Sequence, residues 1–223
     1  MNLALFDLDH TLIPFDSGMA WTRFLVERGV LPPQAEAQYL AYCHQYVAGT
    51  LDIHAMHRAN VTPLITYPRA QIEAWAREFE ARMAASIPAS MLALVRGHQA
   101  AGDLCAIVTA TPRFIAEPFA RLFGIGELLA TEAATSGDPP EEALTGEIAG
   151  EPCFREHKVS RTQAWLAQRR TSLAGFEVSW FYSDSASDLP LLGAVSHPVA
   201  VQPDERLLAH ARAAGWRILP RAA

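Results

Sequence analysis

The sequence lacks the features of several common protein classes. Its 223 residues hold 18 Lys and Arg against 24 Asp and Glu, a net charge of −6. That balance offers no basic surface for a nucleic acid. No apolar run approaches the roughly 18 residues that a membrane-spanning helix needs, and the segment from Asn2 onward lacks the basic and apolar regions of a signal peptide. We therefore expect neither a nucleic-acid partner nor a membrane partner.

Cysteine is also scarce. The three cysteines, Cys43, Cys105 and Cys153, lie far apart, and no Cys-x-x-Cys pair occurs. An odd number of widely separated cysteines does not predict a disulfide framework. A reduced, cytoplasmic protein fits this usage best, and we expect it to be a monomer or a homodimer.

What the sequence does contain is a regular alternation of buried strands and helices. Half of its residues are hydrophobic, enough for one sizeable core or for one core with a smaller satellite domain. The apolar run from Leu3 to Phe6 predicts a strand that is buried on both faces. Helix patterns separate it from further predicted strands at 104–108, 128–131, 178–182, 199–201 and 216–219, with a hairpin at 143–149 and a loop at 136–140. This order predicts an α/β fold with a Rossmann-like, doubly wound parallel sheet.

The segment from 16 to 86 has a different character. Helical periodicity runs through it, broken only by prolines, and no strand pattern interrupts it. We predict an all-helical cap domain over 16–86, inserted into a core domain formed by 1–15 and 87–223. Such an insertion would lie beside the carboxyl end of the first strand.

Charged and hydroxyl side chains occur where several of the predicted strands end. Parallel strands end at one edge of their sheet, and ligands bind there in folds of this kind. We therefore expect these side chains to share one cleft. In chain order they are Asp7, Asp9, Thr109, Lys158, Asp184 and Asp188.

This set of side chains suits phosphoryl transfer from a phosphate monoester. The ester is a dianion, and it repels a carboxylate nucleophile unless cations intervene. Mg²⁺ takes hard oxygen ligands, which Asp7, Asp184 and a backbone carbonyl can supply. Lys158 and the Thr109 hydroxyl can hold the phosphoryl oxygens. Asp9 can protonate the leaving alkoxide and later deprotonate water.

The order and spacing of these residues resemble the haloacid dehalogenase-like superfamily across nearly the whole chain. A helical cap soon after the first motif is similar to the subgroup that includes phosphoserine phosphatase. The resemblance implies a Mg²⁺-dependent phosphatase that hydrolyses a small-molecule phosphate ester through an aspartyl-phosphate intermediate. The residues that match the four motifs are Asp7-x-Asp9-x-Thr11, Thr109, Lys158 and Asp184-x-x-x-Asp188.

The resemblance also implies a role for each carboxylate of the first motif and the fourth. Asp7 would be the nucleophile and a metal ligand. Asp9 would be the general acid and base, with its main-chain carbonyl on the metal. Asp184 would be the third metal ligand, and Asp188 would orient Lys158 or a metal-bound water.

The remaining motif residues would bind phosphate or support the turn. Thr109, Ala110 and Lys158 would contact the phosphoryl oxygens, and Thr11 would hold the turn of the first motif. Two departures from phosphoserine phosphatases leave the substrate open. The chain has Ala110-Thr111 where they have Gly-Gly, and it has Ser183-Asp184-Ser185 and Ser187-Asp188 where they have Gly-Asp-Gly and Asn-Asp.

Several positions bear on the choice of substrate. Asp16, nine residues after Asp7, either caps a helix or faces the amino group of an amine-bearing phosphate. His10 either touches the leaving group or is simply the variable position of its motif. Four aromatic residues at helical spacing are expected in the core of the cap rather than in a wall that stacks on the substrate: Trp21, Tyr39, Tyr42 and Tyr46.

The resemblance to this subgroup implies an amine-bearing substrate, either a phosphoserine-like compound or histidinol phosphate. One alternative is a phosphotransferase that passes the phosphoryl group to an alcohol. Another, from a different class, is a signalling receiver that is phosphorylated on an aspartate. Receivers place that aspartate after a later strand, and they have no reason to carry a helical cap.

Overall fold

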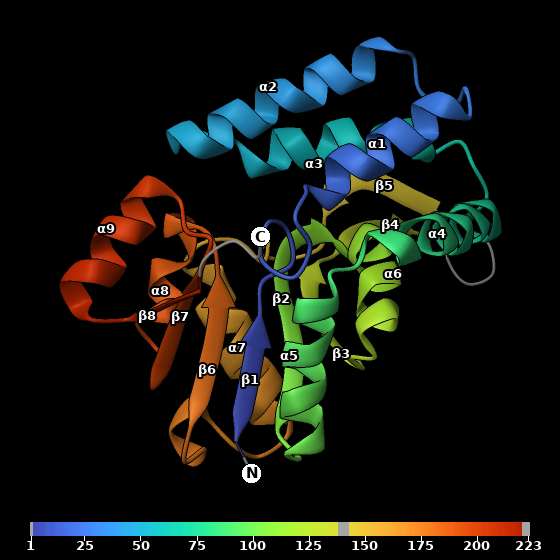
Figure 1. The fold of residues 1–223 in the computed structure, drawn as a ribbon. Coiled ribbons are helices and arrows are strands. Elements are labelled where there is room, and N and C mark those ends of the chain that lie inside the picture. The colour runs from blue at the N-terminus through green and yellow to red at the C-terminus, as the bar shows by residue number, and fades with distance from the viewer. Residues whose placement is uncertain (1, 138–142, 220–223) are drawn as a thin grey trace.

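One parallel sheet forms the centre of the molecule (Figure 1). The structure is a computed structural model that describes residues 2–137 and 143–219. The sheet has six strands in the order β3-β2-β1-β6-β7-β8, and each neighbouring pair runs parallel. The strands are β1 (Leu3–Phe6), β2 (Leu104–Pro112), β3 (Glu127–Thr131), β6 (Ser179–Ser183), β7 (His197–Val201) and β8 (Arg217–Leu219).

The first strand lies in the middle of this sheet. β1 pairs with β2 on one side and with β6 on the other. All of its residues are fully buried. Ala4 and Phe6 belong to one hydrophobic cluster, and Leu3 and Leu5 belong to the other. A strand between two helical layers must be apolar on both faces, so the expectation of a doubly buried first strand is confirmed.

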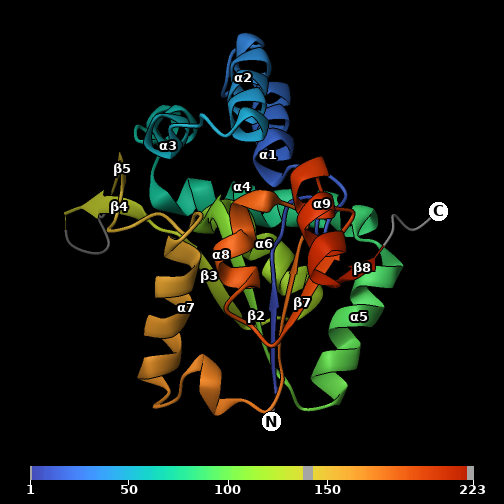
Figure 2. The same cartoon turned by 90° about the vertical axis from the view of Figure 1, so that its left-hand side faces the viewer.

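Helices cover both faces of the sheet, as Figure 2 shows. Side chains of α5 and α6 pack into one hydrophobic cluster, and those of α7, α8 and α9 pack into the other. The predicted α/β fold with a doubly wound parallel sheet is confirmed. None of the described helices is both long and apolar enough to cross a membrane. The helices of these two layers are α5 (Ala89–Ala100), α6 (Arg113–Phe123), α7 (His157–Gln168), α8 (Leu189–Leu192) and α9 (Glu205–Ala214).

The segment between β1 and α5 is helical, as expected. Three of its helices, α1 (Ser17–Glu27), α2 (Gln34–Ala48) and α3 (Ile53–Val61), lie above the carboxyl ends of the strands (Figure 1). The fourth, α4 (Arg69–Met83), packs against α6 at the side of the sheet instead. The division into a cap over 16–86 and a core stays a prediction.

An aromatic cluster connects these helices to the sheet layer. The ring of Phe79 on α4 lies 5.2 Å from that of Trp21 on α1 and 5.7 Å from that of Phe119 on α6. Both contacts are edge-to-face, the geometry that aromatic quadrupoles favour. Burial of these large rings fixes α1 and α4 against α6, and it thereby fixes the loop that carries the first motif.

A second, small sheet lies below α3. It pairs β4 (Ala133–Ser136) with β5 (Ala143–Ile148) in antiparallel fashion. The prediction of a hairpin within 143–149 is therefore wrong, because this segment is a single strand whose partner precedes it. Gly146 has a φ of +87°, and a Cβ on it would lie 3.0 Å from the Thr62 hydroxyl. It marks a bulge and a close approach rather than a turn. Most of the loop expected at 136–140 lies outside the described residues.

Candidate active site

The structure brings the predicted site residues together at the carboxyl edge of the sheet. Asp7 follows β1, Thr109 lies near the end of β2, and Asp184 follows β6. Because β1 lies between β2 and β6, these three strand ends are immediate neighbours. Lys158, in the first turn of α7, reaches the same point.

Asp7 is held from two sides. Its Oδ1 accepts a hydrogen bond from the Lys158 ammonium at 2.8 Å, and its Oδ2 lies 3.2 Å from the Thr11 hydroxyl. Burial raises the pKa of Asp7, while Lys158 acts in the opposite direction. A buried carboxylate with a specific cationic partner at a strand end is typical of functional sites.

Lys158 is the only lysine in the sequence. Its side chain is only 3% exposed, and its Nζ donates to Asp7 and, at 2.7 Å, to Asp188. Burial works to lower its pKa, but Asp188 and Asp7 raise that pKa well above the usual value. An ammonium has three protons. Two of them serve carboxylates, which leaves one for a further anionic oxygen.

Asp188 supports Lys158 from the opposite side. Its Oδ2 accepts hydrogen bonds from Lys158 and from the Ser183 hydroxyl, both at 2.7 Å. Burial raises its pKa to about 6. Its Oδ1 is buried and has no hydrogen-bond partner within the described part of the chain. A buried oxygen of this kind indicates a water or ligand that completes the site.

Thr11 connects the first motif to the fourth. Its hydroxyl lies 3.2 Å from both Asp7 Oδ2 and Asp184 Oδ1, and it accepts a hydrogen bond from the Asp184 backbone N–H at 3.0 Å. Burial raises the pKa of Asp184 well above its usual range, and the nearby charge of Asp7 adds to that rise. Two carboxylates around one hydroxyl repel each other unless a cation or a proton lies nearby.

This set of oxygen donors fits Mg²⁺. The ion is bound in proteins by one or two carboxylates, and it keeps several waters. Asp7 and Asp184 supply the carboxylates, and the partnerless Oδ1 of Asp188 suits one of the waters. No cluster of three or more His, Cys, Asp or Glu side chains suited to a metal occurs in 2–137 or 143–219. A set with two carboxylates and one main-chain carbonyl does not require such a cluster.

Asp9 is held by two short hydrogen bonds. Its Oδ1 accepts from the Ser17 backbone N–H, and its Oδ2 accepts from the Thr111 hydroxyl, each at 2.6 Å. Burial raises the pKa of Asp9 to about 6, with Asp16 adding to the rise. A carboxyl group with such a pKa can exchange a proton near neutral pH.

Thr109 and Ala110 lie where β2 leaves the regular ladder. The pairing of β2 with β3 is irregular between Val108 and Pro112. The buried Thr109 hydroxyl accepts a hydrogen bond from the Thr111 backbone N–H at 3.2 Å, and Ala110 is half-buried. Their contact with phosphate stays a prediction.

The structure separates the two substrate-facing candidates. Asp16 caps α1, because its Oδ1 accepts from the Met19 backbone N–H at 2.7 Å, and the same oxygen accepts from the Tyr39 hydroxyl at 2.9 Å. Among the described residues, its Oδ2 has one hydrogen-bond partner, the Cys43 thiol at 3.8 Å. His10 has a φ of +57° and an exposed side chain. The helix-cap role of Asp16 is thus observed, and one of its oxygens is left for another partner.

Sequence reasoning missed several hydroxyl groups that hold the site together. Thr111 binds Asp9, and Ser183 binds Asp188. Tyr46 does not lie in the cap core as expected, because its hydroxyl reaches Ser185 at 3.0 Å and Ser187 at 2.7 Å. The sequence did contain one sign of these contacts. Four hydroxyl residues stand where the motifs of phosphoserine phosphatases have glycine or asparagine.

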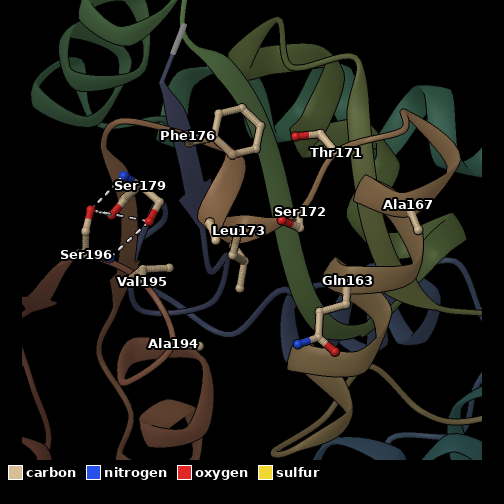
Figure 3. Close-up of a pocket in the computed structure, with 11 residues that line it drawn as sticks. Gln163, Ala167, Thr171, Ser172, Leu173, Phe176, Ser179, Ala194, Val195 and Ser196 are labelled. Carbon is tan, nitrogen blue, oxygen red and sulfur yellow. Dashed lines mark hydrogen bonds between the residues drawn. The ribbon is translucent and has the colours of Figure 1, made fainter.

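Two cavities lie elsewhere, and none of the predicted site residues lines either of them. One, of about 760 Å³, includes Ser179 at the amino end of β6, where hydrogen bonds join Ser179 to Ser196 (Figure 3). The 11 described residues that line it carry no charge. The other, of about 470 Å³, lies between α4, α6 and the β4–β5 sheet. An uncharged lining is poorly suited to a phosphate dianion, so the first cavity does not compete with the carboxyl edge.

The sequence model of the haloacid dehalogenase-like hydrolases matches residues 4–193. The chain belongs to this family. It is 39% identical over 220 residues to a histidinol-phosphatase of Neisseria meningitidis, and the match covers 98% of each chain. The expected resemblance and the expected enzyme class, a phosphatase of this family, are confirmed by these matches.

Solved structures agree with the fold. A protein of unknown function from Bordetella pertussis Tohama I is 40% identical, with a TM-score of 0.89 over 98% of this chain and 97% of that one. A substrate-bound phosphoserine phosphatase superposes with a TM-score of 0.68 at 15% identity, over 98% of this chain and 92% of that one. The second match supports the haloacid dehalogenase-like fold alone.

Proposed function

We propose that this protein hydrolyses a small-molecule phosphate monoester, with Asp7 as the nucleophile that forms an aspartyl-phosphate intermediate. The observation that carries the proposal is the position of Asp7 at the end of the central strand, bonded to the buried ammonium of Lys158 at 2.8 Å. A phosphoryl group approaching this carboxylate would meet a cation at the same point. Covalent catalysis by such a carboxylate divides one difficult displacement into two easier ones.

The other side chains then have separate tasks. Asp7 attacks phosphorus as the ester oxygen leaves, and Asp9 gives that oxygen its proton. Asp9 later takes a proton from the water that releases phosphate from Asp7. The third N–H of Lys158 and the Thr109 hydroxyl donate to the phosphoryl oxygens. Asp188 keeps Lys158 in place throughout.

Mg²⁺ completes the proposed site. Asp7, Asp184 and the main-chain carbonyl of Asp9 would hold it. When bound, the ion neutralises negative charge between the carboxylates and the phosphoryl group. Thr11 lies between the two carboxylates, and its hydroxyl can donate to either of them.

We propose histidinol phosphate as the first substrate to test and a phosphoserine-like compound as the second. The 39% identity to the Neisseria histidinol-phosphatase, over nearly the full length of both chains, supports this order. Both esters carry an amino group. The Asp16 Oδ2, whose one partner in the described part of the chain is a thiol, is suited to such a cation.

The test is phosphate release from histidinol phosphate, phosphoserine and p-nitrophenyl phosphate, with Mg²⁺ or with a chelator. We expect Mg²⁺-dependent release by the wild type and a loss of about 10³-fold or more in Asp7→Asn. Equal release by the wild type and Asp7→Asn would overturn the proposal.

The same assay separates the alternatives. A phosphorylated alcohol formed when an acceptor alcohol is added indicates a phosphotransferase. A phosphorylated Asp7 that persists for minutes without phosphate release indicates a receiver-like protein.

A further inference from the structure

The carboxylate of Asp9 receives one hydrogen bond from the end of β2 and one from the start of α1. The Thr111 hydroxyl, from the end of β2, donates to Oδ2 at 2.6 Å. The Ser17 backbone N–H, from the first turn of α1, donates to Oδ1 at 2.6 Å. Hydrogen bonds to an ionised acceptor are short and strong. Rotation of the carboxylate would therefore break both of them.

The irregular end of β2 brings Thr111 to this position. Residues 109–111 leave the regular pairing with β3, and the Thr111 backbone N–H donates to the Thr109 hydroxyl at 3.2 Å. Thr111 is 9% exposed. Its backbone N–H is held by the Thr109 hydroxyl, while its own hydroxyl binds Asp9.

The Thr111 hydroxyl has a single proton, which it donates to Asp9 Oδ2. Its oxygen is therefore left to accept from the Ser17 hydroxyl, which lies 3.4 Å away. Each carboxylate oxygen of Asp9 thus accepts one of these two hydrogen bonds and, within the described part of the chain, its second lone pair stays free.

We infer that Thr111 is a positioning residue for proton transfer by Asp9. Its hydroxyl holds the Asp9 carboxylate in the orientation that serves the leaving group. The inference rests on the proposed function, because it assigns Asp9 to proton transfer. The glycine that the resemblance implies at this place in phosphoserine phosphatases has no hydroxyl to offer.

A positioned proton matters most when the leaving oxygen is strongly basic. The alkoxide of an alkyl phosphate such as histidinol phosphate needs the proton as the bond breaks. The p-nitrophenolate ion is a far weaker base and leaves without it. A defect in positioning Asp9 should therefore depend on the ester, whereas a general distortion of the site should not. The ratio kcat/KM reports this step, because it covers events up to the first irreversible departure.

The experiment compares Thr111→Val, which keeps the shape of the side chain and loses the hydroxyl, with Thr111→Ser, which keeps the hydroxyl. For histidinol phosphate, or for the best alkyl phosphate found in the assay above, we expect kcat/KM of Thr111→Val to fall by about 10- to 100-fold. For p-nitrophenyl phosphate we expect a fall of less than about 3-fold, and Thr111→Ser should stay within about 3-fold on both esters.

Three results would overturn the inference. These are an equal loss on both esters, no loss in Thr111→Val, and a loss in Thr111→Ser as large as that in Thr111→Val. Thermal unfolding of each variant shows whether it folds, and Thr111→Ala replaces Thr111→Val if the latter does not. A wild type that is inactive on every ester contradicts the proposed function, and with it this inference. An active wild type with ester-independent variants contradicts the inference alone.

Discussion

The edge of the sheet and the helices above it are held by different kinds of contact. At the edge, the side chains of Lys158 and Asp188 are 3% and 1% exposed, and they bond to each other at 2.7 Å. Above it, Tyr46 is 36% exposed and bonds to Ser187 at 2.7 Å, while Arg155 donates to the carbonyl of Gly49 at 2.9 Å. The first set is desolvated and charged, and the second borders solvent.

This difference predicts which contacts can be substituted at small cost to stability. Removing one partner of a buried charge pair leaves the other charge uncompensated, which is strongly destabilising. Removing a hydrogen bond that borders water costs much less, because water replaces the lost partner. We therefore expect the charged side chains at the strand ends to tolerate few substitutions. The contacts of α2 with the core, by contrast, can change at small cost.

The largest expected effect comes from Lys158→Met. This change leaves Asp7 and Asp188 buried without their cation, and it removes the ammonium that we propose as a donor to the phosphoryl group. We expect kcat to fall by about 10²- to 10³-fold, measured as phosphate release at saturating ester.

The matched control is Arg155→Met, which removes one positive charge from the loop that touches α2. We expect it to lower kcat by less than about 3-fold, because its contact borders solvent. Equal losses in the two variants would show that net charge matters, and not the buried position of Lys158.

A smaller effect is expected from Tyr46→Phe, which removes the hydroxyl that reaches Ser185 and Ser187. Loss of these neutral hydrogen bonds should raise KM by about 2- to 10-fold with little change in kcat. Tyr42→Phe is the control, since Tyr42 lies on the same helix and its hydroxyl makes no hydrogen bond within the described residues. A KM that is unchanged in Tyr46→Phe, or raised equally in both variants, would contradict a bridging role.

The smallest expected effect concerns the pH dependence of stability in the metal-free protein. Asp188 has a pKa of about 6 in the folded state, raised by burial from an ordinary value of 3.8. Between these values the folded chain binds a proton that the unfolded chain has released, so stability from this group falls as pH rises. Asp188→Asn lacks this dependence, and its amide can keep the oxygen that accepts from Lys158 and Ser183.

The measurement is thermal unfolding with a chelator from pH 4.5 to 7.5. We expect the wild-type midpoint to fall relative to that of Asp188→Asn by a few degrees across this range. A relative rise would contradict the raised pKa.

Because Lys158 is the sole lysine, nitrogen-15 labelling of lysine places one reporter beside Asp188. The resonance of that reporter should shift with a midpoint near pH 6.

Much of the fold was predictable because its signals are local. The unbroken apolar run of β1 indicates burial on both faces, and the alternation of strands and helices indicates a parallel sheet. Once the sheet is parallel, Asp7 and Asp184 must end at one edge. The structural role of Gly146 was not predictable in this way, because a glycine within a strand pattern marks a turn or a bulge equally well.

Among the site contacts, those between distant segments escaped prediction. The departures at Thr111, Ser183 and Ser187 were visible in the sequence, but their partners were not. Tyr46 has helical spacing like its neighbours on α2, and only its reach toward Ser187 distinguishes it. A hydroxyl group has no sequence signal for its partner, because almost any nearby acceptor can satisfy it.

The order of the helices and strands, and the charged groups at their ends, could be predicted from the amino-acid sequence because burial and turn patterns are local. Only the tertiary structure decided which hydroxyl holds which carboxylate. The contact between Asp9 and Thr111 joins residues 102 positions apart. Such a contact depends on how two strand ends lie side by side after the sheet has formed, and no local pattern records it.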